Sequence, residues 1–94
     1  NISSNGFLNI VVLITSKGNI HDTPIIIAKG IPIDNIEDLK YLISQEIQKV
    51  IKTFSLNNKK QEDNLVETLK IVSRKVTKEK TGKKPLTNIN LIRI

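Results

Sequence analysis

The chain has 94 residues and a mass of 10.6 kDa, of which 38% are hydrophobic and 26% charged. This size leaves room for one small domain and excludes a separate substrate domain, and the composition is that of a folded domain rather than of a disordered tail. The net charge is +6, and the absence of cysteine excludes disulfides, thiolate zinc sites and cysteine nucleophiles.

The first strand is predicted over the β-branched run from Phe7 to Thr15, which follows Gly6 and precedes the polar turn residues 16–19. A second strand is predicted from Pro24 to Lys29, because this apolar run ends at Gly30 and Pro32. The connection between the two runs is short and polar, so we expect them to pair as an antiparallel hairpin.

Two amphipathic helices are predicted next. Apolar residues recur at helical spacing from Ile36 to Phe54, and Asp34, three residues before Glu37, is expected to cap the start of this helix. After the polar residues 55–60, the second helix is predicted to end near Thr81 with Gly82 as its C-cap. Its apolar stripe is expected to consist of Leu65, Leu69, Val72 and Val76.

A last strand is predicted from Leu86 to Ile94, which completes the order ββααβ. This order indicates an α+β fold in which a small three-stranded sheet, mixed or antiparallel, carries both helices on one face. Residues 1–94 are interpreted as a single domain of a longer chain, because the sequence starts at Asn1 and contains no methionine.

The first strand is apolar on both sides, whereas two helices cover only one face of a sheet. Phe7, Val11 and Leu13 lie in the alternation phase opposite to the predicted core. We therefore expect these three residues to form an interface, either with a second copy of the chain or with another domain of the parent chain. The alternative is that a terminal segment folds over them.

The sequence contains no arrangement of residues that is typical of a catalytic site. His21 is the only histidine and falls in the predicted hairpin connection, where an ordinary loop role is expected. The carboxylate pairs Glu37/Asp38 and Glu62/Asp63 fall in first helical turns, where their negative charge interacts favourably with the helix dipole. We expect no catalytic residue, no metal ligand and no cofactor in this chain.

No apolar run approaches the ~20 residues of a membrane span, and we expect a cytoplasmic protein.

The net charge lies in the last third of the sequence. From Lys59 onward ten basic residues face four acidic ones, a difference of six, whereas the preceding residues are balanced. Six of these basic residues form a row on and after the second helix: Lys70, Arg74, Lys78, Lys80, Lys83 and Lys84. Such a row is suited to the phosphates of RNA, although a solvated helix face is the alternative. With only three aromatic residues, RNA binding is expected to be unspecific for sequence.

Taken in order, these segments resemble the C-terminal domain of ribonuclease J, a bacterial nuclease of the metallo-β-lactamase/β-CASP family, in its alphaproteobacterial form. The resemblance rests on the strand from Gly6 to Thr15, the segment ending Ala28-Lys29-Gly30-Ile31-Pro32, the two helices, and Lys80-Thr81-Gly82-Lys83-Lys84-Pro85 before the last strand.

This resemblance implies a parent enzyme that is a zinc-dependent hydrolase with endoribonuclease and 5′–3′ exoribonuclease activity. The family's metal-ligand pattern H-x-H-x-D-H has no match in the chain, so zinc is expected in the catalytic domain of the parent. The leading hypothesis is a non-catalytic accessory and oligomerisation domain, with a second copy or the parent's catalytic domains as partner. An RNA-backbone-contacting module is the second hypothesis, and a small-ligand regulatory domain is the third.

Overall fold

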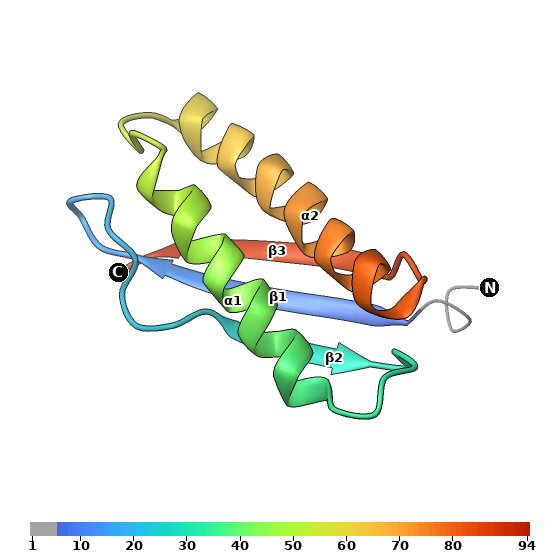
Figure 1. Ribbon diagram of the computed structural model, residues 1–94. Coiled ribbons are helices and arrows are strands. Elements are labelled where there is room, and N and C mark those ends of the chain that lie inside the picture. The colour runs from blue at the N-terminus through green and yellow to red at the C-terminus, as the bar shows by residue number, and fades with distance from the viewer. Residues whose placement is uncertain (1–5) are drawn as a thin grey trace.

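The computed structural model describes residues 6–94 and has the predicted ββααβ order (Figure 1). The elements are β1 (Phe7–Ile14), β2 (Ile25–Lys29), α1 (Ile36–Lys52), α2 (Lys59–Thr81) and β3 (Leu86–Arg93). The order and type of these elements confirm the α+β fold. Each strand begins and ends within one residue of the predicted positions.

The three strands form one mixed sheet in the order β2-β1-β3. The central strand β1 pairs antiparallel with β2 and parallel with β3, so the hairpin prediction is confirmed. The register places Phe7 between Lys29 and Leu86, and Val11 between Ile25 and Asn90. Because side chains alternate along a strand, residues in the same row of this register point to the same face.

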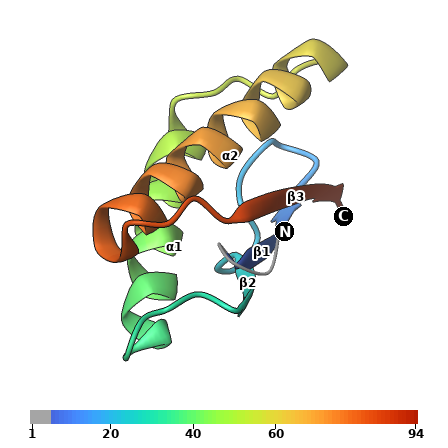
Figure 2. The ribbon, with the colours of Figure 1, turned by 90° about the vertical axis from the view of Figure 1, so that its right-hand side faces the viewer.

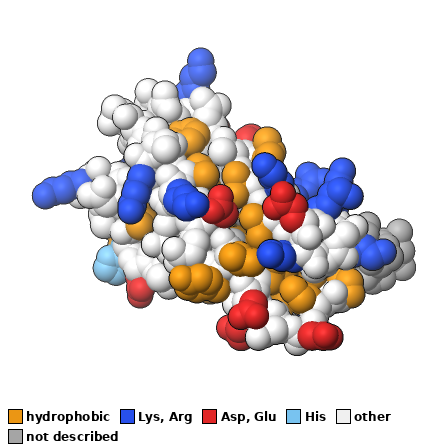
Figure 3. All heavy atoms as spheres, in the orientation of Figure 1, with side chains coloured by type: hydrophobic (Ala, Val, Ile, Leu, Met, Phe, Trp, Pro, Cys, Tyr) orange, Lys and Arg blue, Asp and Glu red, His pale blue; other side chains and the backbone are white. Residues whose placement is uncertain are grey.

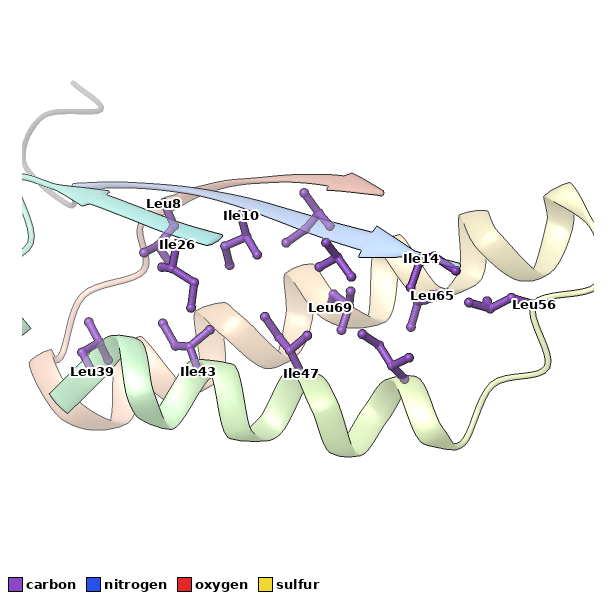
Figure 4. Close-up of a cluster of buried hydrophobic side chains, with 13 residues drawn as sticks. Leu8, Ile10, Ile14, Ile26, Leu39, Ile43, Ile47, Leu56, Leu65 and Leu69 are labelled. Atoms are coloured by element: carbon purple, nitrogen blue, oxygen red, sulfur yellow. The ribbon is translucent and has the colours of Figure 1, made fainter. Parts of the chain in front are cut away.

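Both helices cover one face of the sheet, which gives the molecule two layers (Figure 2). Along β1, every second side chain points toward the helices and is fully buried, from Leu8 to Ile14. Leu39, Ile43 and Ile47 of α1 lie opposite these strand residues (Figure 4). Burial of each such side chain stabilises the fold by about 1.5–3 kcal/mol, so this single layer of aliphatic contacts holds the domain together.

The start of α1 corrects one prediction. Asn35, and not Asp34, is the N-cap, and its Oδ1 accepts hydrogen bonds from the backbone N–H groups of Glu37 at 3.2 Å and Asp38 at 3.3 Å. The residue directly before the first helical turn is the one whose side chain reaches these free N–H groups. The helix ends at Lys52, two residues earlier than predicted.

The buried row of α2 also differs from the prediction. Leu65 and Leu69 are buried as expected, but the row continues with Ser73 and Thr77, while Val72 and Val76 are only half-buried. Steps of four residues follow a ridge that is inclined to the helix axis, so the buried row departs from the apolar stripe that the sequence suggests. At the other end, Gly82 is the predicted C-cap, with a φ of 75° that favours glycine.

Candidate functional site

Two surfaces collect the residues that the sequence singles out. The first is the face of the sheet opposite to the helices, and the second is the outer side of α2. Among residues 6–94, no group of three or more histidine, cysteine, aspartate or glutamate residues is close enough to hold a metal ion. His21 lies exposed in the connection between β1 and β2.

The open face is defined by the side chains of the three strands that point away from the helices. The structure brings Phe7, Val11 and Leu13 together in its central strand, where all three are half-buried. The remaining members of the open face are Asn9, Ile25, Ile27, Lys29, Leu86, Asn88, Asn90 and Ile92. The sequence alone does not reveal that the four aliphatic residues of the edge strands share this face, because the face to which each side chain points depends on the register with β1.

Those four aliphatic residues are the most accessible apolar groups of the open face. Their exposed fractions are 52% for Ile25, 42% for Ile27, 53% for Leu86 and 45% for Ile92. No described segment of the chain covers them. Together with Phe7, Val11 and Leu13 of β1, they make most of the open face apolar, and exposed apolar side chains gathered on one face mark an interaction site.

Three asparagines lie in the middle of the open face. The Oδ1 atom of Asn9 accepts hydrogen bonds from Nδ2 of Asn88 at 3.2 Å and from Nδ2 of Asn90 at 3.1 Å. These bonds use the Oδ1 of Asn9 and one N–H of each of the other two side chains. The Nδ2 of Asn9 can still donate, and the Oδ1 atoms of Asn88 and Asn90 can still accept, further hydrogen bonds. The centre of the open face can therefore both donate and accept hydrogen bonds.

On the outer side of α2, basic residues surround two adjoining hollows at the junction with β3. Lys70, Arg74 and Lys84 line the first, next to Glu67 and Thr87. Arg74 and Lys84 also line the second, with Lys75, Lys78 and the exposed Ile71. We call this continuous surface the basic groove and define it by its cations: Lys70, Arg74, Lys75, Lys78 and Lys84. Basic side chains gather beside the C-terminal half of α2 in Figure 3.

The structure divides the six basic residues that the sequence grouped. Lys70, Arg74, Lys78 and Lys84 lie in the basic groove. Lys80 lines two hollows between α2 and α1, one of which Lys75 also lines, and Lys83 is exposed but lines neither part of the groove. Lys75 was missed, although Ile71, Lys75 and Lys78 share one helix face by their spacing of three and four residues.

Another basic residue of the last third, Arg93, serves the fold itself. Its Nε donates to Glu62 Oε2 at 2.7 Å, and a terminal nitrogen donates to the backbone oxygen of Leu56 at 2.8 Å. A longer contact of 3.5 Å reaches the backbone oxygen of Thr15. The guanidinium thereby links the end of β3 to α2 and to the connection between the helices.

The cations of the basic groove are poorly compensated. Within residues 6–94, Lys70 is the only one of the five that forms an ion pair, with Glu67 at 3.7 Å. Lysines on other parts of the helices, such as Lys40 and Lys49, pair with glutamates of their own helix. An excess of positive charge on a concave surface attracts a polyanion.

None of the helices in the described part of the chain is long and apolar enough to cross a membrane. A family model described as the ribonuclease J C-terminal domain matches residues 1–94, which is the whole chain. A comparison with curated proteins finds no match.

Proposed function

The chain belongs to the ribonuclease J C-terminal domain family, and from this membership we propose that it is a non-catalytic accessory domain that joins subunits of its parent ribonuclease. The proposed parent is a cytoplasmic hydrolase of the metallo-β-lactamase/β-CASP type, with endoribonuclease and 5′–3′ exoribonuclease activity. Zinc does not fit the residues present here, because the described residues contain no cluster that could ligate it. We therefore assign the zinc to the catalytic domain of the parent.

The observation that supports subunit joining is the apolar open face. It presents aliphatic side chains from all three strands, with exposed fractions of 42% to 53% on the edge strands. Apolar surface gains about 25 cal/mol for each Å² removed from water. Covering these side chains is therefore favourable.

A second copy of the chain is the proposed occupant, and charge favours it. The open face has one charged residue, Lys29, whereas the excess charge of the domain lies on α2 and after it. Two copies that meet through their open faces bury none of the cations of the basic groove, which limits the repulsion between two chains of net charge +6. The three asparagines offer donors and acceptors to the same groups of a symmetry-related copy, as an isologous interface requires.

The area of the open face determines how stable we expect the dimer to be. A strand of eight residues is about 26 Å long, and three strands are about 14 Å wide. The open face therefore covers roughly 360 Å², which is less than half of the about 800 Å² per partner that a standard stable interface buries. We therefore expect a dimer that dissociates on dilution.

The proposal is tested by light scattering coupled to size-exclusion chromatography on the 94-residue chain, over a series of concentrations. The variant Ile27→Glu places a charge on the open face, at a residue that is 42% exposed and therefore tolerates substitution. The matched control is Ile71→Glu, which makes the same change on α2 at a residue that is 64% exposed.

We expect the unmodified chain and Ile71→Glu to show the same concentration-dependent dimer, and Ile27→Glu to remain monomeric. Circular dichroism of both variants establishes that they are folded. A monomer at every concentration, or a dimer that survives Ile27→Glu, would contradict self-association through the open face.

A further inference from the structure

We propose that the basic groove binds single-stranded RNA through its phosphate backbone. The choice of RNA among polyanions rests on membership in a ribonuclease family, whereas the site itself rests on geometry and charge. The cations of the groove lie outside the open face, although Leu86 belongs to both surfaces because it also lines the first hollow. RNA binding and subunit joining are therefore separable by variants of the cations.

The spacing of the groove cations fits an extended strand of phosphates. Lys70, Arg74 and Lys78 follow each other in steps of four residues along α2, which places them about 6 Å apart and spreads them over about 12 Å. Lys84 comes from the connection to β3 and lies on the same surface as Arg74, because both line the two hollows. The groove thus presents cations along a line and from a second element.

The balance of charge within the groove favours an external anion. Five cations meet a single carboxylate, Glu67, and the distance of 3.7 Å from Glu67 Oε1 to Lys70 Nζ makes this a weak pair. An exposed pair of this kind contributes less than about 1 kcal/mol, so a phosphate displaces the carboxylate at little cost. Arg74 adds a planar guanidinium that can bind two phosphate oxygens at once.

The composition of the groove favours nucleic acid over an acidic protein. Protein interfaces usually have an apolar centre surrounded by polar residues, whereas the groove has two exposed aliphatic residues, Leu86 in the first hollow and Ile71 in the second, beside its five cations. Interfaces with nucleic acid are more polar and much more positive. None of the described residues that line the groove is aromatic, so bases have no stacking platform there and little dependence on RNA sequence is expected.

The test measures the affinity of the 94-residue chain for a fluorescent single-stranded oligoribonucleotide over a range of salt concentrations. The logarithm of the binding constant falls with the logarithm of the salt concentration, with a slope of about −0.7 for each phosphate neutralised on a single strand. Four or five neutralised phosphates give a slope of about −3. The double variant Arg74→Ala/Lys78→Ala is expected to reduce the magnitude of this slope by about 1.4.

The matched control is Lys17→Ala/Lys52→Ala, which removes the same total charge from exposed positions outside the groove. We expect its slope to equal that of the unmodified chain. Equal slopes for the two double variants would mean that only the overall charge attracts RNA, and this result would overturn the proposal. Equally tight binding of poly-glutamate would also overturn it, because the groove would then recognise charge and not phosphate.

Light scattering on the same samples separates this proposal from the proposed function. Arg74→Ala/Lys78→Ala should keep the dimer and show the reduced slope, whereas Ile27→Glu should lose the dimer and keep the slope of the unmodified chain. If the dimer is absent but the groove variant still lowers the slope, subunit joining fails and RNA binding stands. If the dimer is present and the slope does not change, RNA binding fails alone.

Discussion

Replacing Arg93 with alanine should destabilise the domain by about 2 kcal/mol. The guanidinium donates to Glu62 Oε2 at 2.7 Å and to the backbone oxygen of Leu56 at 2.8 Å. The Arg93 side chain is 39% exposed and that of Glu62 is 22% exposed, so solvent weakens the ion pair, and we assign it about 1 kcal/mol. The bond to the carbonyl, made by a charged donor in a half-buried position, adds about 1 kcal/mol or slightly more.

Urea unfolding followed by circular dichroism at fixed protein concentration measures this loss, which corresponds to a fall in melting temperature of roughly 10 °C for a domain of this size. Arg93→Lys should lose most of the same stability, because an ammonium group cannot reach both acceptors in the geometry of a guanidinium. Arg74→Ala is the control, since Arg74 has no ion pair among residues 6–94. A cost below about 0.5 kcal/mol for Arg93→Ala, which is typical of unremarkable surface positions, would refute this account of the contact.

Three further substitutions test the packing and capping of the fold, each by the same unfolding measurement. Gly6→Ala should cost at least about 2 kcal/mol, because Gly6 has a φ of +86° and an added Cβ would lie 2.9 Å from the backbone oxygen of Gly30; an unchanged midpoint would show that this turn relaxes freely. Ser73→Ala should leave stability equal or raise it by up to about 1 kcal/mol, since the buried Ser73 Oγ has no hydrogen-bond partner among residues 6–94. A clear loss there would reveal a partner for the hydroxyl. Asn58→Ala should cost about 1 kcal/mol, because Asn58 Oδ1 accepts from the backbone N–H of Gln61 at 2.9 Å at the start of α2. Asn58→Asp should retain most of that stability, and a loss as large as that of alanine would contradict the capping role.

The order of the elements and the bounds of the strands were predictable from the sequence to within a residue, because they depend on local signals. Alternation and β-branched residues mark β1, and helical spacing marks α1. Gly82 ends α2 because glycine readily adopts the positive φ required there. These signals act within a few residues, so they do not depend on how the elements pack.

The features that sequence analysis missed depend on contacts between distant residues. The parallel pairing of β3 with β1 decides that Leu86 and Ile92 share a face with Phe7 and Leu13. The inclination of α2 decides that Ser73 is buried and Val72 is not. Likewise, the turn after Gly82 brings Lys84 back beside Arg74 and leaves Lys83 outside the groove. The sequence therefore predicted that cations gather along α2, but not which of them line the groove.

The parallel pairing of β1 with β3 also determines the order in which the molecule can form. Contacts between these strands, such as that between Asn9 and Asn88, join residues 79 positions apart, whereas the hairpin and the helix pair need only neighbouring segments. Non-local pairings of this kind slow folding. On the ribosome, β1 emerges long before β3. The backbone N–H and C=O groups of β1 that pair with β3 therefore have no partner until the last strand has been made. The growing chain therefore passes through a stage in which one edge of β1 is open to pairing with other chains, until β3 closes it.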